Sequence, residues 1–107
     1  MIFVIITLFP QMFEQSFSSS IIGQAAKKKL IKIKLVNLRN FGQGPHKTVD
    51  DKPFGGGGGM VMKTDCAVSA IEKTLKELPK PAKSILLTPT GAVFNQEKAA
   101  NFAKLAA

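Results

Sequence analysis

Several residue types are scarce in this sequence, and each shortage excludes a class of protein. A single cysteine, Cys66, cannot form an internal disulfide, which fits a reducing cytosol. One cysteine and one histidine, without an acidic cluster, predict no metal site. No stretch approaches the roughly 20 apolar residues of a membrane span, so we expect no membrane association. Trp and Tyr are absent, and eight Phe supply the aromatic bulk.

Acidic residues are also few, and the imbalance suggests a partner. Seven acidic against 15 basic side chains give a net charge of +8 and a pI near 9.9. A domain this basic favours an anionic partner such as nucleic acid, although a lysine-coated soluble surface has the same composition. Five lysines can attract phosphate without reading bases, or can form a solvated face. They are Lys27, Lys28, Lys29, Lys32 and Lys34.

The length of 107 residues and the 45% hydrophobic content predict one small domain with a core. Residues 1–10 are apolar and could be mistaken for a signal peptide. They lack a basic start and a cleavage site, so a buried strand explains them better. We predict this strand over Ile2–Leu8, buried on both faces because it is continuously apolar.

Hydrophobic spacing predicts further helices and strands in alternation. Pro10 fits the first turn of a helix, and a short second helix is predicted over Ile21–Lys29. Residues 31–35 alternate lysine with aliphatic side chains, which indicates a strand with one solvent-facing side. Residues 40–60 form the least regular segment, and a loop of this length is usually functional or disordered.

The carboxyl-terminal part continues the alternation. Thr64 or Asp65 can cap a helix over 64–78, a buried strand is predicted over 84–88, and Asn95 can cap a last helix. The helix over 64–78 has an apolar face made of Val68, Ile71, Leu75 and Leu78. The pattern predicts an α/β fold with a mostly parallel sheet flanked by helices.

Two segments are candidate ligand sites. The turn at 89–91 follows a predicted strand, and parallel sheets bind ligands at this edge, although an ordinary turn is the commoner explanation. The five glycines of 55–59 do not form a P-loop or a dinucleotide fingerprint, because Met60 and Met62 interrupt both patterns. The glycine run is therefore either part of a loop that closes over a ligand or a flexible linker.

Three segments of the sequence carry a recognisable motif: residues 46–60, HKTVDDKPFGGGGGM, together with Leu8-Phe9-Pro10 and Leu87–Gly91. Residues 46–60 are similar to the signature H-[RK]-[TQ]-[VT]-D-D-[RK]-[PA]-[YF]-G-G-G-x-G-M of the TrmD-type bacterial tRNA (guanine-N1)-methyltransferases of the SPOUT superfamily. The other two segments resemble that family's first strand end and its L-[ST]-P-x-G turn. The match covers essentially the whole chain, but Gly58 and Cys66 stand where the family often has proline.

The resemblance implies an activity that this chain holds only in part. The family transfers a methyl group from S-adenosylmethionine to N1 of the guanine 3′ of a tRNA anticodon, as a knotted homodimer. Its members are considerably longer, and the catalytic Asp with its Arg companion, the trefoil knot and the carboxyl-terminal tRNA-binding domain correspond to sequence beyond Ala107. We therefore expect residues 1–107 to be a partial methyltransferase domain with no catalytic residue of its own.

Two sets of site residues follow from the resemblance. Residues expected to contact the cofactor are Leu86, Leu87, Thr88, Pro89, Thr90 and Gly91. Residues expected to face the guanine and tRNA are His46, Asp50, Gly55, Gly56, Gly57, Gly58 and Gly59. Asp50 and Asp51 could instead serve as loop caps, and His46 outside its motif would more often be a surface residue.

Two hypotheses remain open. The chain is a cytoplasmic methyltransferase fragment that is inactive alone, or a non-catalytic basic RNA-binding module derived from that fold. Without neighbouring strands, exposed edges and apolar faces would favour aggregation, so we expect marginal solubility in isolation.

Overall fold

Two parallel strands form the centre of the molecule. The structure is a computed structural model that describes residues 1–42, 44–45, 50–51 and 61–106. Strand β1 (Ile2–Thr7) pairs in parallel with β2 (Lys32–Asn37), with Ile2 opposite Lys32 and Thr7 opposite Asn37. Parallel strands need a crossover connection, and helices supply it here. The predicted α/β class is confirmed.

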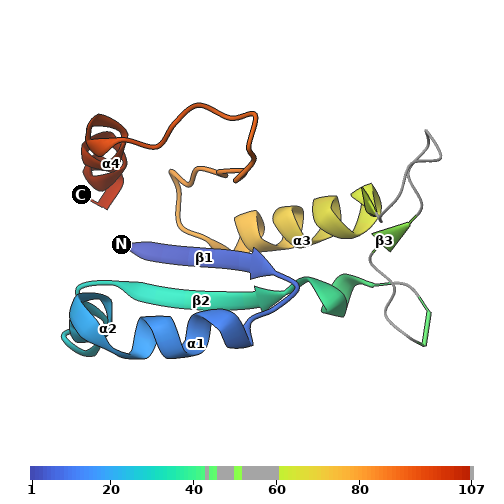
Figure 1. Cartoon of the computed structure of the whole chain (residues 1–107), viewed down its shortest axis with the longest axis horizontal. Helices are drawn as coiled ribbons and strands as arrows, with labels where there is room; N and C mark the ends of the chain where they lie inside the picture. Colours follow the sequence, from blue (N-terminus) through green and yellow to red (C-terminus); the bar gives the residue numbers. More distant parts are fainter. Residues whose placement is uncertain (43, 46–49, 52–60, 107) are drawn as a thin grey trace.

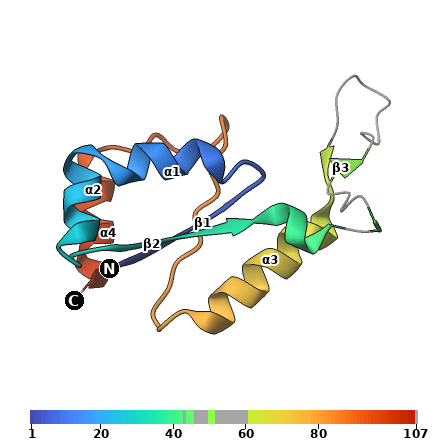
Figure 2. The same cartoon turned by 90° about the horizontal axis from the view of Figure 1, so that it is seen from below.

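The crossover consists of two short helices at an angle to each other. Helix α1 (Gln11–Ser18) follows Pro10, whose φ of −56° suits a helix start. The chain becomes extended at Ser19, and α2 (Ser20–Lys27) begins immediately after it. Both helices lie on one side of the β1–β2 ribbon and α3 (Thr64–Glu77) lies on the other (Figures 1 and 2).

The fully buried core is small and lies between α3 and a one-turn helix. Leu38 belongs to this helix, η1 (Leu38–Phe41), while Cys66 and Ala70 belong to α3. Their exposed fractions are 2%, 1% and 0%. The partly buried side chains packed against them are Ile6, Leu8 and Phe41. The core therefore joins the carboxyl end of the sheet to α3.

A short hairpin stands between η1 and α3. Its strands β3 (Asp50–Asp51) and β4 (Val61–Met62) pair antiparallel. At the far end of the chain, α4 (Gln96–Ala103) lies at the same end of the molecule as the start of β1 (Figures 1 and 2), and η2 (Lys104–Ala106) follows it. No helix in the described ranges is long and apolar enough to cross a membrane.

The two later helices begin differently. Asn95 caps α4 as predicted, because its Oδ1 accepts a hydrogen bond of 2.9 Å from the Lys98 backbone N–H. Lys63 holds the cap position of α3, in place of either of the two following residues, and makes no side-chain cap bond. The predicted cap of α3 was therefore wrong by one or two residues.

Two predictions of burial were wrong for the same reason. Ile2 and Phe3 in β1 are 43% and 45% exposed, and residues 84–88 are exposed and form no strand. A strand is stable only when its backbone groups pair with a neighbour, and burial on both faces needs elements on both sides. Within the described residues, no strand pairs with residues 84–88.

The buried face of α3 also differs from the prediction. Val68 and Ile71 are 44% and 39% exposed, whereas Cys66 and Ala70 are buried. The other two members of the predicted face, Leu75 and Leu78, are half-buried. Small side chains therefore allow α3 to approach η1 closely. Hydrophobicity alone did not distinguish the face in contact with η1 from the apolar face beside it.

Candidate functional site

Both parallel strands end at one edge of the sheet, where side-chain hydrogen bonds turn the backbone after each strand. Thr7 Oγ1 accepts a hydrogen bond of 3.1 Å from the Phe9 N–H, just after β1. Asn37 Oδ1 accepts one of 3.0 Å from the Arg39 N–H, just after β2. These local hydrogen bonds replace the hydrogen bonds between strands at the point where each strand ends. The carboxyl edge of an open α/β sheet is the usual ligand edge.

An arginine–aromatic pair occupies this edge. The Arg39 guanidinium carbon lies 6.0 Å from the centroid of the Phe9 ring, within cation–π range. Both side chains are exposed. Our sequence reasoning missed this pair, although each residue stands two positions after its strand ends and the strands are in register. A flat cationic surface of this kind can meet a nucleobase or a phosphate.

The predicted turn after residue 88 is confirmed. The Gly91 N–H donates to the Thr88 carbonyl at 3.1 Å, and the Thr90 N–H donates to Thr88 Oγ1 at 3.4 Å. Leu86 and Leu87 are 85% and 90% exposed. Within the described residues, no backbone hydrogen bond joins 84–87 to another segment. The backbone groups of this segment are therefore accessible to a ligand.

The predicted guanine- and tRNA-facing loop is described only at its base. His46 and the five glycines at 55–59 lie outside the described residues. Asp50 is described through its backbone, which pairs opposite Met62, and Asp51 pairs opposite Val61. The hairpin β3–β4 thus joins the two ends of residues 52–60.

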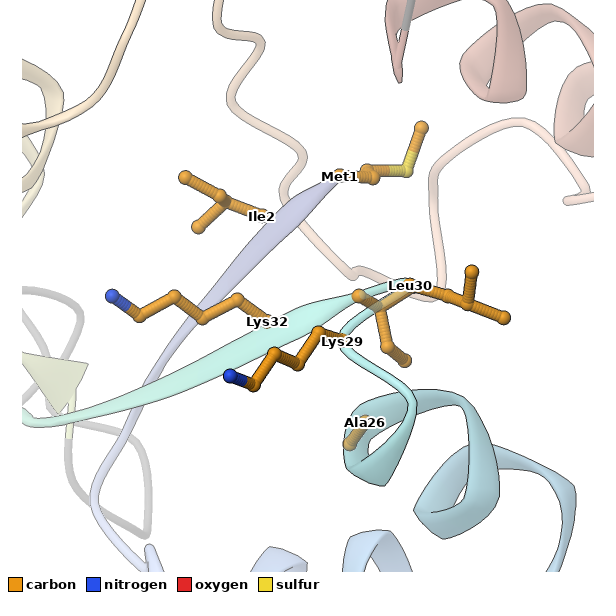
Figure 3. Close-up of a pocket in the computed structure, with 7 residues that line it drawn as sticks. Met1, Ile2, Ala26, Lys29, Leu30 and Lys32 are labelled. Atoms are coloured by element: carbon orange, nitrogen blue, oxygen red, sulfur yellow. The ribbon is translucent and has the colours of Figure 1, made fainter.

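Within the described part of the chain, two cavities lie away from the predicted cofactor turn. One cavity of about 420 Å³ lies at the amino end of the sheet (Figure 3), and another of about 220 Å³ lies between α1 and β2. Neither is lined by a residue of 84–91. The β3–β4 hairpin and the segment between α3 and α4 also lie apart in both views (Figures 1 and 2).

An exposed ion pair links the sheet to α3 below the candidate edge. Lys34 Nζ donates to Glu77 Oε2 at 2.9 Å, and the two side chains are 52% and 48% exposed. The hydrogen bond from Lys34, together with its charge, lowers the pKa of the Glu77 carboxyl below its ordinary value of 4.5. The pair connects β2 to α3 at an exposed position, where such contacts are weak.

Curated proteins similar to this chain include two tRNA (guanine-N(1)-)-methyltransferases. A tRNA (guanine-N(1)-)-methyltransferase of Dehalococcoides mccartyi (strain CBDB1) is 44% identical over 100 residues, which are 94% of this chain and 40% of that protein. One from Alkaliphilus metalliredigens is 46% identical over 104 residues, 94% of this chain and 41% of that protein. This chain therefore spans about 40% of the length of these curated relatives.

A solved structure supports the same relationship. The crystal structure of a tRNA (m1G37) methyltransferase from Aquifex aeolicus matches with a TM-score of 0.68 and 32% identity, over 76% of this chain and 36% of that one. The family model described as "tRNA (Guanine-1)-methyltransferase TrmD" matches residues 1–107. Because that model matches the chain from its first residue to its last, the chain belongs to the TrmD family of tRNA (guanine-1)-methyltransferases.

Proposed function

We propose that this chain forms the amino-terminal part of a site that methylates N1 of the guanine 3′ of a tRNA anticodon. The observation that carries the proposal is the family match over all of residues 1–107. The methyl donor we propose is S-adenosylmethionine, which supplies an electrophilic methyl group on a sulfonium. The proposed setting is cytoplasmic, and the proposed assembly is a homodimer with a SPOUT knot.

The segment 86–91 fits one wall of a nucleoside-cofactor cleft. The backbone groups of Leu86 and Leu87 are accessible, and the turn that follows is held by the Gly91–Thr88 hydrogen bond. Leu86 and Leu87 offer apolar surface to a flat ring. Other walls must enclose the cofactor, because these residues are open to solvent here.

The guanine end of the site has different requirements. N1 of guanine carries a proton, so the reaction needs a general base and groups that stabilise charge developing on the ring. We propose that the loop with His46, Asp50 and the glycines at 55–59 positions the guanine. The base itself is assigned to none of these residues, because none of them matches the family's catalytic Asp.

A dimer would let the two segments meet, because the base of the guanine loop, hairpin β3–β4, lies apart from the segment between α3 and α4 (Figures 1 and 2). The segment 86–91 and the hairpin β3–β4 share neither of the described cavities. We propose that the cofactor segment of one subunit faces the guanine loop of its partner. Such an arrangement lets the methyl group and N1 be held in line by two rigid halves.

A chimera tests the proposed function. Residues 1–107 replace the matching segment of the Aquifex aeolicus enzyme, and methyl transfer is measured on a tRNA transcript with guanine 3′ of the anticodon. We expect transfer to this transcript and none to one with adenine at that position. A chimera that melts cooperatively but transfers no methyl group would refute the proposal. RNA binding without transfer would favour the non-catalytic alternative.

A variant in the same chimera tests the cofactor wall. A Cβ at Gly91 would lie 3.2 Å from Thr88 Cγ2 and 3.3 Å from the Thr88 carbonyl oxygen. Gly91→Val should therefore distort the turn and raise KM for the cofactor by about tenfold, the effect of about 1.4 kcal/mol. Ala92→Val, at the exposed neighbouring position, is the matched control and should leave KM nearly unchanged.

A further inference from the structure

A run of unbalanced positive charge surrounds the end of α2. Residues 15–49 contain seven lysine and arginine residues and no acidic residue. Four of them form what we call the basic surface: Lys27, Lys28, Lys29 and Lys32. All four are exposed. Within the described residues none of the four has an acidic partner, whereas nearby Lys34 is paired with Glu77.

Lys29 adopts a backbone conformation that lysine rarely takes. Its φ is +60°, in the left-handed region, at the position just past a helix end where glycine is usual. The Lys29 N–H donates to the Ala26 carbonyl at 3.1 Å, and the Leu30 N–H donates to the Ala25 carbonyl at 3.0 Å. Glycine would make the same bonds without strain. A lysine at this strained position points to a function for its charged side chain.

The strained lysine also lines the larger cavity. Lys29 and Lys32 lie on its wall, and their side chains run in the same direction (Figure 3). Two positive charges carried on one wall make the local potential positive, which attracts an anion. Lysines in the last turn of a helix can serve its dipole, which explains Lys27 and Lys28. That explanation does not extend to Lys32, which lies in β2.

We propose that the basic surface binds the phosphate backbone of the tRNA at the amino end of the sheet, opposite the carboxyl edge that holds Arg39 and Phe9. This inference rests on the proposed function for the identity of the RNA. The six-residue strands separate the two edges by about 20 Å. Lysines there add affinity and orientation without reading bases. The target guanine is recognised elsewhere.

Salt-dependent binding of the 107-residue chain to a labelled tRNA transcript tests this surface. In one variant all four of its lysines are changed to Gln, and in the control Lys76, Lys80, Lys83 and Lys104, all exposed, are changed to Gln. Both variants fall from a net charge of +8 to +4. We expect the surface variant to lose at least tenfold in affinity near 100 mM salt, with its log–log salt slope reduced by about 3–3.5. The control should lose much less.

Lys29→Gly separates a binding role from a structural one. Relief of the left-handed conformation should leave the melting temperature unchanged or slightly higher, while the lost charge lowers tRNA affinity about threefold and the salt slope by about 0.7–0.9.

Equal losses in the two four-lysine variants, or no tRNA binding by the unaltered chain, would overturn the proposal. Binding is measured without cofactor and without methyl transfer. A failed chimera would therefore refute the proposed function alone, and a binding loss confined to the surface variant would still support this surface.

Discussion

Gly23 shows how one missing side chain sets the angle of the crossover. It is buried in α2, and a Cβ built there would lie 2.7 Å from the carbonyl carbon and oxygen of Ser18 at the end of α1. Real Cβ atoms do not approach a backbone this closely, so α1 and α2 can meet as they do only with glycine. The residue is fixed by packing rather than by a positive φ.

Replacing Gly23 with alanine should therefore destabilise the fold. Alanine improves helix propensity by about 1 kcal/mol, but the clash forces α2 to move, and overpacking typically costs about 1–3 kcal/mol. We expect a net loss of stability in urea unfolding. Gln24→Ala, at an exposed position of the same helix, gains propensity without a clash and should not destabilise. Equal stability of the two variants would contradict this account.

The Lys34–Glu77 ion pair gives a residue-scale prediction about pH. The pKa of Glu77 is lowered in the folded chain, so the pair's contribution is complete above pH 4.5 and is lost as pH falls through the lower folded pKa. In Lys34→Gln, an NMR titration should find the Glu77 pKa raised toward 4.5. The stability difference from the unaltered chain should shrink in acid. Lys32→Gln lies on the same strand outside the pair and should leave the Glu77 pKa unmoved.

At the scale of elements, sequence patterns correctly predicted the features that depend on residues nearby in the sequence. The alternation of lysines with aliphatic residues predicted β2, and Pro10 and Asn95 marked the starts of α1 and α4 correctly. Each of these signals acts within a few residues. The segment 84–88 failed as a predicted strand because a strand depends on a distant partner, and none is present in the described residues.

The cap of α4 allows a direct test of a local signal. Asn95→Ala removes the acceptor for the Lys98 N–H, and loss of a cap typically costs about 1 kcal/mol. The amides in the first turn of α4 should then exchange faster with deuterium. Asn101→Ala is the matched control, because it makes the same change at an exposed position inside the helix. Equal exchange in both variants would refute a role for the cap.

At the scale of the whole molecule, the chain is looser than a compact domain. Its radius of gyration is 16.0 Å, whereas a compact domain of 100 residues has one of about 13 Å. Exposed aliphatic and aromatic side chains gather between α3 and α4, including Ile85, Leu86, Leu87 and Val93. Apolar surface of this extent usually meets other protein. This looseness fits a fold that needs additional chain or a partner copy.

We expect the isolated chain to bind a hydrophobic dye and to have limited solubility. Changing both Leu86 and Leu87 to Lys should lower dye fluorescence and raise the saturation concentration. Ala82 and Ala92, which are also exposed, changed together to Lys add the same charge without removing apolar surface. If the alanine variant improves solubility equally, net charge rather than exposed leucine limits it.

The candidate site was predictable only where a motif marks it. The turn at 88–91 follows from Pro89 and Gly91, and its geometry was predicted correctly. The Arg39–Phe9 pair was missed because no local pattern records that two strand ends are neighbours. The assignments of cofactor and guanine contacts remain predictions. They depend on residues that lie outside the described ranges, such as His46, or that are open to solvent, such as Leu86 and Leu87.

The buried thiol of Cys66 can report how often the junction of α3 and η1 opens. It is the sole cysteine of the chain, and it is 1% exposed. A thiol reagent can reach it only after the junction opens, so the rate of modification relative to that of a free thiol measures the free energy of that opening. Because the same junction leads into both the hairpin and the carboxyl edge, the measurement would report how tightly the candidate loop is anchored, with no label added to the protein.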